Sequence, residues 1–380
     1  MSLAPTAAPS ASPRVFRTLS DRQHRRRRLA PAPRSFYEFD DATTDDFLAP
    51  EIARARLVVR EDDVVGRGAF SECFGGVLDD GTAVIAKRYR DDVRGRDVQS
   101  FYADELESAR ATKTCDGVCR FLGACGVEQW LVWEDVGRAT LEDVLVDGAD
   151  DAMAMARERL GRREDEDDAE TFRAVSASLA ASVSSVHAFD FIHRDVKPAN
   201  VVLNEKESRM VLCDVGACAD VRTGRNMSGD EAIFDPTYGA PEQFRRVETR
   251  GGGFPNLGGL FGGGKRESSA DAAVRMEASG EPPTTLLDAF SLGATLLRCG
   301  VPSLRAPGAM ERARRDIDAC GGDVERWRRD VCVPGVNDWS LVDETGAWTT
   351  IVRLTKADPS ERWSVERALE SDAFLSGGAP

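Results

Sequence analysis

Residues 192–203 have the sequence Ile192-His193-Arg194-Asp195-Val196-Lys197-Pro198-Ala199-Asn200-Val201-Val202-Leu203. Asp195 supplies a carboxylate that can orient a hydroxyl group and accept its proton. Lys197, two residues later, supplies a positive charge that can neutralise a moving phosphoryl group, and Asn200 supplies an amide oxygen that can bind a metal ion. Three such groups within six residues, enclosed by apolar residues, make this stretch a candidate functional loop.

The segment upstream of this loop contains further groups suited to phosphate binding. A short β-like stretch over 57–65 precedes the loop Gly66-Arg67-Gly68-Ala69-Phe70-Ser71, whose glycines let backbone amides approach phosphate oxygens. The apolar strand 83–86 ends in Lys87, which needs an anionic partner if it is buried. A helix is predicted over 98–112, and Glu105 on its expected inward face is the predicted partner of Lys87, with Glu107 as the alternative.

Four more segments follow in order along the chain. Leu131 to Gly137 has the pattern of a strand followed by a hinge, and Asp214 lies in the run Leu212-Cys213-Asp214-Val215-Gly216. The triplet Ala240-Pro241-Glu242 precedes a candidate long helix that begins with Asp288-Ala289-Phe290-Ser291-Leu292-Gly293. Near the C-terminus, Arg362 is a candidate ion-pair partner of Glu242.

Together these segments resemble the landmarks of eukaryotic protein kinases over residues 57–375. The resemblance implies an α+β, protein-kinase-like fold of two lobes within a kinase domain over 57–376. A small β-rich N-lobe is expected over 57–134 and a larger helical C-lobe over 138–376, with ATP bound in the cleft between them.

The resemblance also implies a role for each matching residue. Asp195 and Lys197 are the expected catalytic residues, and Asn200 and Asp214 the expected ligands of Mg²⁺. The expected ATP-binding residues are Gly66, Arg67, Gly68, Ala69, Phe70, Ser71, Lys87, Glu105, Glu134 and Val136.

The groups that catalysis requires favour an active enzyme over a catalytically silent pseudokinase scaffold, since all six are present: Lys87, Glu105, Asp195, Lys197, Asn200 and Asp214. Two positions depart from the family pattern. Ser71 replaces the third glycine of the loop, and Val215 replaces an aromatic residue after Asp214. Lys197 resembles the serine/threonine kinases, so protein serine or threonine hydroxyls are the expected acceptors.

Arg194 can pair with an anion on the segment that follows Asp214. The hydroxyl groups there are either sites of regulatory phosphorylation or ordinary side chains without that role; the candidates are Thr223, Ser228, Thr237 and Tyr238.

Two regions are similar to the thylakoid state-transition kinases of chloroplasts: 214–226 with 234–243, and 301–305 with Cys320, Asp323 and Trp327-Arg328. The resemblance implies light-harvesting or photosystem II proteins as substrates, in the stroma or at the stromal face of the thylakoid. Kinases of this group are expected to have a membrane span and a cysteine pair before the kinase domain. This sequence has no apolar run of 18 residues and no cysteine before Cys73, so a soluble or peripherally membrane-bound stromal relative, without a membrane span, is the expectation.

The distribution of charge separates the N-terminus from the rest of the chain. The 380 residues carry 50 basic and 65 acidic side chains, a net charge of −15 that disfavours nucleic acid as the main partner. Residues 1–36 are rich in Arg, Ser, Ala and Pro, which favours a transit peptide. A nuclear signal or a disordered basic tail are the alternatives, with the nucleus or cytoplasm as the location. An acidic linker is expected over 37–56.

Two insertions and the cysteines complete the sequence. Residues 146–169 are acidic and 249–283 are rich in Gly, Ser, Glu and Pro, so both are predicted to be flexible insertions, the first as a solvated helix or a loop. Nine irregularly spaced cysteines beside three histidines disfavour a zinc site and predict reduced, mostly buried thiols.

Overall fold

The computed structural model describes residues 51–376 apart from Ala69, 91–97, Val127, 229–234, 250–272 and Pro334. The predicted transit peptide lies outside the described residues. Of the predicted linker, 37–50 also lies outside them, whereas Ile52 is buried against the N-lobe and its amide donates to the Ala124 carbonyl. The end of that segment is therefore part of the lobe, because burial of Ile52 favours packing over a free linker.

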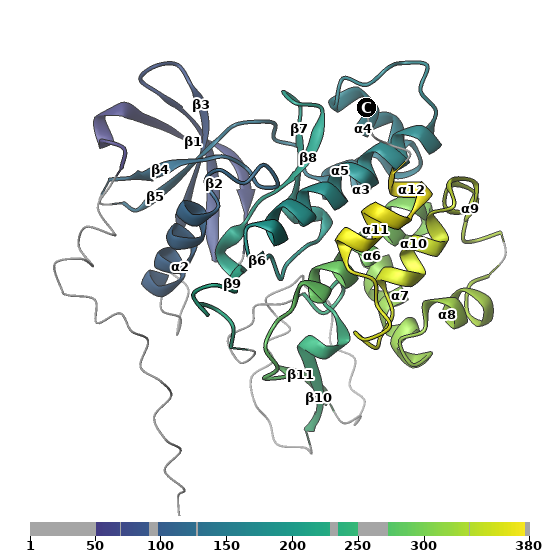
Figure 1. Ribbon diagram of the computed structural model, residues 1–380. Coiled ribbons are helices and arrows are strands. Elements are labelled where there is room, and N and C mark those ends of the chain that lie inside the picture. Colours follow the sequence, from purple (N-terminus) through teal and green to yellow (C-terminus); the bar gives the residue numbers. More distant parts are fainter. Residues whose placement is uncertain are drawn as a thin grey trace, which may run out of the picture. The chain divides into compact units, whose positions relative to one another are not determined.

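The N-lobe is a five-stranded antiparallel sheet with one helix (Figure 1). The strand order is β1-β2-β3-β5-β4, and α2 carries its buried residues at i, i+3, i+4 and i+7, with Glu105 among them. The elements are β1 (Leu57–Arg67), β2 (Ser71–Leu78), β3 (Ala83–Tyr89), α2 (Val98–Ala111), β4 (Phe121–Cys125) and β5 (Trp130–Glu134).

The C-lobe is mainly helical, and of its short strand pairs β6–β9 and β7–β8 lie near the N-lobe whereas β10–β11 lies away from it (Figure 1). This arrangement confirms the predicted two-lobed α+β fold. Its helices are α3 (Leu141–Gly148), α4 (Ala152–Arg159), α5 (Asp168–Ala188), α6 (Thr285–Gly300), α7 (Ala309–Ala319), α8 (Val324–Asp330), α9 (Ser340–Thr345), α10 (Ala347–Leu354), α11 (Val365–Ser371) and α12 (Ala373–Ser376). Its strands are β6 (Phe191–Ile192), β7 (Val201–Asn204), β8 (Arg209–Leu212), β9 (Ala219–Asp220), β10 (Phe244–Thr249) and β11 (Ala273–Ala278).

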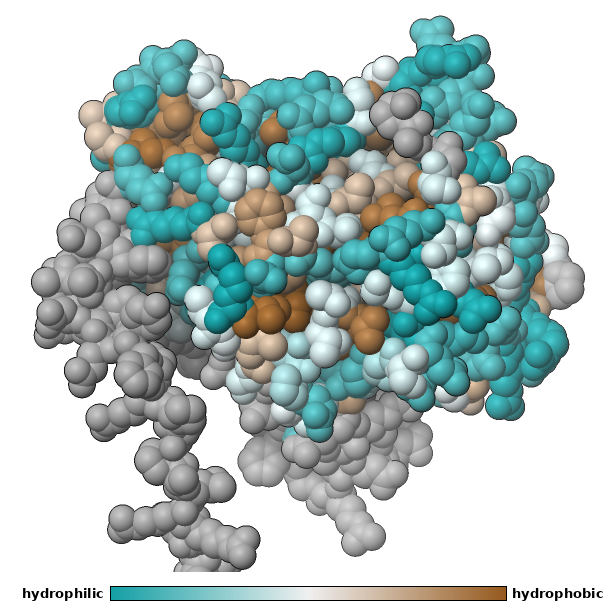
Figure 2. All heavy atoms as spheres, viewed as in Figure 1, coloured by the Kyte–Doolittle hydropathy of each residue, from teal (hydrophilic) through white to brown (hydrophobic). Residues whose placement is uncertain are grey.

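Helix α6 is the centre of the C-lobe. Every residue from Leu287 to Gly300 is buried, so this helix is enclosed on all sides. A Cβ atom at Gly293 would lie 2.7 Å from Thr355 Cγ2 and 2.8 Å from Leu354 Cβ, and glycine is needed there for α10 to pack closely. On the face shown in Figure 2, hydrophobic side chains form small separate groups among hydrophilic ones.

The two predicted insertions differ from each other. Residues 146–169 are not a flexible insertion, because α4 lies within them and buries Met153, Ala156 and the following Leu160. Their spacing of three and four residues places them on one helix face, which the acidic composition concealed. Within 249–283, residues 250–272 lie outside the described part, and β10 and β11 pair across them.

Among the described residues, no helix combines the length and apolar character needed to cross a bilayer. All nine cysteines are free thiols, six of them buried.

His187 at the end of α5 joins α6 and α11 through charge. Its Nε2 lies 3.0 Å from Asp288 Oδ2 and its Nδ1 lies 2.9 Å from Glu366 Oε1. Burial lowers the pKa of His187, but the hydrogen bonds to both carboxylates outweigh this and raise the pKa to about 9.

We therefore expect His187→Gln to destabilise the fold in a pH-dependent way. The raised pKa stabilises the folded state fully below the unfolded value of about 6.5, and this contribution is lost as the pH rises through about 9. Urea unfolding at pH 6 should show a loss on the order of 2 kcal/mol, and a smaller loss at pH 9.5. An equal loss at both pH values would contradict the charge-based account.

Candidate active site

Lys87 connects the two lobes at the cleft. It lies on β3 between Cys73 of β2 and Leu131 of β5, and its side chain is buried. Its Nζ donates to Glu105 Oε1 at 2.7 Å and to Asp214 Oδ1 at 2.8 Å. Burial lowers the pKa of Lys87, but the carboxylates of Asp214 and Glu105 outweigh it and hold the pKa above its ordinary value. Lys87 is therefore charged.

The two candidate partners of Lys87, Glu105 and Glu107, lie on different faces of helix α2. Glu105 is fully buried on the inner face, where burial raises its pKa against the opposing effect of Lys87. The Glu107 side chain is 42% exposed and lies 3.4 Å from Arg225 Nε. The structure thus joins Lys87 to Glu105, and Glu107 belongs to a different contact.

Tyr89 is a site residue that the sequence analysis missed. Its hydroxyl donates to Glu105 Oε2 at 2.5 Å, so the carboxylate of Glu105 is held by Tyr89 and Lys87 together. The Tyr89 ring stacks on Phe101 of α2 at 6.4 Å, and Phe101 stacks on Phe70 at 5.4 Å. The available signal was its position two residues after Lys87, on the same face of β3.

The glycine-rich loop joins β1 and β2 above the cleft. Gly66 and Arg67 end β1, the Gly68 amide donates to the Ser71 carbonyl at 2.8 Å, and Ala69 lies outside the described residues. A Cβ atom at Gly66 would meet no heavy atom of the described residues within 4 Å. The glycine therefore leaves space there, as the approach of phosphate oxygens requires.

The hinge residues have partners of their own. The Glu134 side chain accepts from Lys206 Nζ at 2.7 Å, a hydrogen bond that lowers the pKa of Glu134. The Val136 carbonyl accepts from the Glu205 amide at 2.9 Å. The Glu134 amide donates to the Arg120 carbonyl at 2.9 Å.

The catalytic loop brings Asp195, Lys197 and Asn200 together between β6 and β7. Asp195 Oδ2 accepts from Asn200 Nδ2 at 2.7 Å and lies 2.9 Å from Lys197 Nζ. Burial raises the pKa of Asp195 to about 6, against the opposing effect of Lys197. Lys197 also lies 3.7 Å from Asp235 Oδ2, a second carboxylate that the sequence analysis did not single out.

Asp288 of α6 holds this loop from below. Its Oδ2 accepts from the His193 amide and its Oδ1 from the Arg194 amide, each at 2.7 Å. Arg194 has a φ of 69°, a left-handed conformation that is rare outside glycine. The two hydrogen bonds to one fully buried carboxylate are the physical reason that this conformation persists.

The C-lobe supplies two side chains, Asn200 and Asp214, whose oxygen atoms could bind a metal ion. The Asn200 amide nitrogen donates both to the Asp195 carbonyl and to Asp195 Oδ2, which directs its oxygen away from them. The Asp214 side chain is 47% exposed, and Lys87 lowers its pKa, so it is ionised. Oxygen atoms of these two types suit a hard cation such as Mg²⁺. Val215, after Asp214, is fully buried.

The segment that ends in Ala240-Pro241-Glu242 is anchored to the C-lobe. Arg362, whose side chain is fully buried, donates to Glu242 Oε1 at 2.6 Å and to Oε2 at 3.0 Å. Tyr238 is also buried, and its hydroxyl accepts from Arg298 at 2.6 Å. Tyr238 therefore packs as a core residue in this structure.

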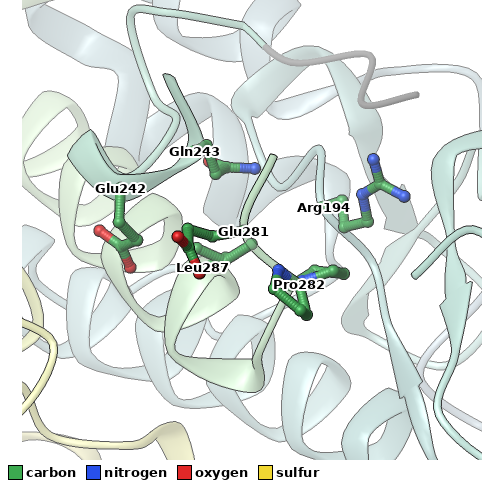
Figure 3. Close-up of a pocket in the computed structure, with 7 residues that line it drawn as sticks. Arg194, Glu242, Gln243, Glu281, Pro282 and Leu287 are labelled. Atoms are coloured by element: carbon green, nitrogen blue, oxygen red, sulfur yellow. The ribbon is translucent and has the colours of Figure 1, made fainter. Parts of the chain in front are cut away.

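Figure 3 shows a pocket beside this anchor, away from Lys87. Pro282 and Leu287 line it together with the polar side chains of Arg194, Glu242, Gln243 and Glu281. The Arg194 guanidinium points away from the two glutamates.

The sequence model of the protein kinase domain matches residues 59–251, about half of the chain. The chain belongs to the protein kinase family. The match includes the four residues whose geometry is described above: Lys87, Glu105, Asp195 and Asp214.

Two curated relatives are chloroplastic serine/threonine-protein kinases of Arabidopsis thaliana, STN8 and STN7. Each is 26% identical to this kinase, over 78% and 73% of the chain respectively. These matches confirm the predicted resemblance to chloroplast kinases. The kinase spans 60% and 50% of the length of these two relatives.

A solved structure of an Stt7 homolog from Micromonas algae, soaked with ATP, has the same fold. Its TM-score is 0.65 at 23% identity, with 86% of this chain and 94% of that chain covered.

We expect Tyr89→Phe to weaken nucleotide handling without unfolding the N-lobe. Loss of the hydroxyl leaves Glu105 with one fewer donor, which corresponds to a fall in kcat/KM for ATP of about three- to tenfold. Steady-state kinetics with a protein acceptor measure kcat/KM for ATP. The control is Tyr102→Phe, at the residue of α2 that follows Phe101. Equal kinetics for Tyr89→Phe and the wild type would show that Lys87 alone positions Glu105.

Proposed function

We propose that this chain is a serine/threonine protein kinase that transfers the γ-phosphoryl group of ATP to protein hydroxyls. The observation that carries this proposal is that Lys87 joins Glu105 of the N-lobe to Asp214 of the C-lobe, beside the Asp195–Lys197–Asn200 group. Such an arrangement provides a positive charge and metal-binding oxygens that can hold a nucleoside triphosphate and neutralise the charge of its phosphates.

Each step of phosphoryl transfer can be assigned to a side chain of this site. Lys87 holds the α- and β-phosphates, and Asp195 orients the acceptor hydroxyl and takes its proton as the oxygen bonds to the γ-phosphorus. The bond from that phosphorus to the bridging oxygen of ADP breaks in the same displacement, and Lys197 neutralises charge on the moving group. The raised pKa of Asp195, about 6, fits a group that must accept a proton.

The oxygens of Asn200 and Asp214 would hold Mg²⁺. The fit rests on the Asn200 amide nitrogen being occupied by Asp195 and on the exposed, ionised carboxylate of Asp214. When bound, Mg²⁺ supplies charge neutralisation of the β- and γ-phosphate oxygens.

The proposed acceptors are chloroplast proteins, such as light-harvesting or photosystem II subunits, and the proposed location is the stroma or the stromal face of the thylakoid. The names of the two Arabidopsis relatives and the transit-peptide composition of residues 1–36 support this. A fluorescent fusion of residues 1–60 that stays in the cytoplasm or nucleus would argue against it.

We expect Asp195→Asn to abolish phosphate transfer while ATP binding remains. The substitution keeps the shape of the side chain but removes the proton acceptor. Transfer of radiolabelled phosphate from Mg²⁺-ATP to a generic basic protein and to isolated thylakoid membranes measures the activity, and a thermal shift with ATP measures binding. Asp190→Asn, at an exposed position of the same lobe, is the control.

Label on serine or threonine that the Asp195→Asn variant does not produce would support the proposal. A folded wild-type protein that binds ATP but labels neither acceptor would instead favour a pseudokinase scaffold.

A further inference from the structure

Arg225 connects the segment after Asp214 to helix α2. Its Nη1 donates to the Asp104 carbonyl at 2.9 Å and to Ser108 Oγ at 3.0 Å, and its Nε lies 3.4 Å from Glu107 Oε2. The Arg225 side chain is only 13% exposed. An arginine this enclosed, with charge-assisted contacts to two turns of one helix, fixes the position of that helix relative to the segment.

Asn226, the next residue, connects the same segment to the catalytic loop. Its carbonyl accepts from Arg194 Nη1, and its side-chain nitrogen donates to the Cys218 carbonyl at 3.0 Å. Asn226 has a φ of 55°, a left-handed conformation that asparagine tolerates better than most residues. Two neighbouring residues thus reach α2 on one side and the catalytic loop on the other.

The turn before Arg225 is held by side-chain oxygens. Asp220 is buried and accepts from the amides of Arg222 and Thr223, at 2.9 and 3.2 Å. Thr223 Oγ1 in turn accepts from the Arg225 amide at 3.3 Å. These hydrogen bonds fix the backbone that presents Arg225 to α2.

The charges at the contact with α2 are complementary. The helix presents Glu107 and a carbonyl oxygen, and the segment presents the cation. Arg194, which sequence analysis offered as a possible partner of an anion on this segment, donates to the backbone carbonyl of Asn226.

We propose that Arg225 is a positioning residue that holds α2 where Glu105 meets Lys87. The inference rests on the proposed kinase function.

Kinetics of Arg225 variants test whether Arg225 positions α2. Arg225→Ala should lower kcat about ten- to hundredfold, since it removes two charge-assisted hydrogen bonds, with little change in the KM for the protein acceptor. Arg225→Lys keeps the charge but not the fork, and should restore part of the rate. Arg222→Ala, at an exposed arginine of the same segment, should match the wild type. Equal rates for Arg225→Ala and Arg222→Ala would overturn the assignment.

Hydrogen exchange separates this inference from the proposed function. Backbone amides of α2 should exchange faster in Arg225→Ala than in Arg222→Ala, whether or not the protein transfers phosphate. If the wild type is inactive, the proposed function fails while this comparison still decides the role of Arg225. Equal exchange in the two variants would contradict that role.

Discussion

The buried carboxylate of Asp288 is the constraint on which the active site depends. Burying an ionised carboxylate is costly unless donors surround it, and here three do: the amides of His193 and Arg194 and the ring of His187. These donors hold the pKa of Asp288 below its ordinary value despite its burial. The catalytic loop is therefore positioned by a helix that is itself enclosed on all sides, which is how a loop can have the rigidity that positioning requires.

From that loop a continuous set of contacts leads into the N-lobe. The Cys213 amide donates to the Asn200 carbonyl at 2.9 Å, and the next residue, Asp214, accepts from Lys87. Lys87 in turn holds Glu105, which lies on the same helix that Arg225 contacts. The segment after Asp214 returns through Asn226 to Arg194, so the contacts form a closed circuit. A change at one connection is expected to reach its neighbours, because Lys87 is shared by two carboxylates and Glu105 accepts from two donors.

Much of this could be predicted from the sequence, for a physical reason. Asp195, Lys197 and Asn200 lie within six residues, and a loop that short keeps its members together, so the resemblance of this stretch to a kinase catalytic loop was enough to predict its chemistry. Glu105 was favoured because its expected helix face turns inward with Leu106, but the spacing alone left Glu107 open.

Contacts between distant segments could not be predicted in this way. Arg225 contacts α2 although the two are separated by more than 100 residues of sequence. Tyr89 lies at the end of an apolar strand, where an aromatic residue is ordinarily interpreted as part of the hydrophobic packing. For residues 146–169 the acidic composition left a solvated helix and a loop equally open, because the buried face of α4 consists of few residues: Ala152, Met153, Ala156 and the following Leu160.

The central claim is that the two lobes form one site for ATP with a divalent cation. Calorimetric titration of ATP into the full chain, with and without Mg²⁺, tests it most directly when Asp214→Asn is measured alongside. The account predicts that Mg²⁺ tightens ATP binding to the wild type and that Asp214→Asn loses most of this effect. ATP binding of equal strength with and without Mg²⁺, in both proteins, would contradict it.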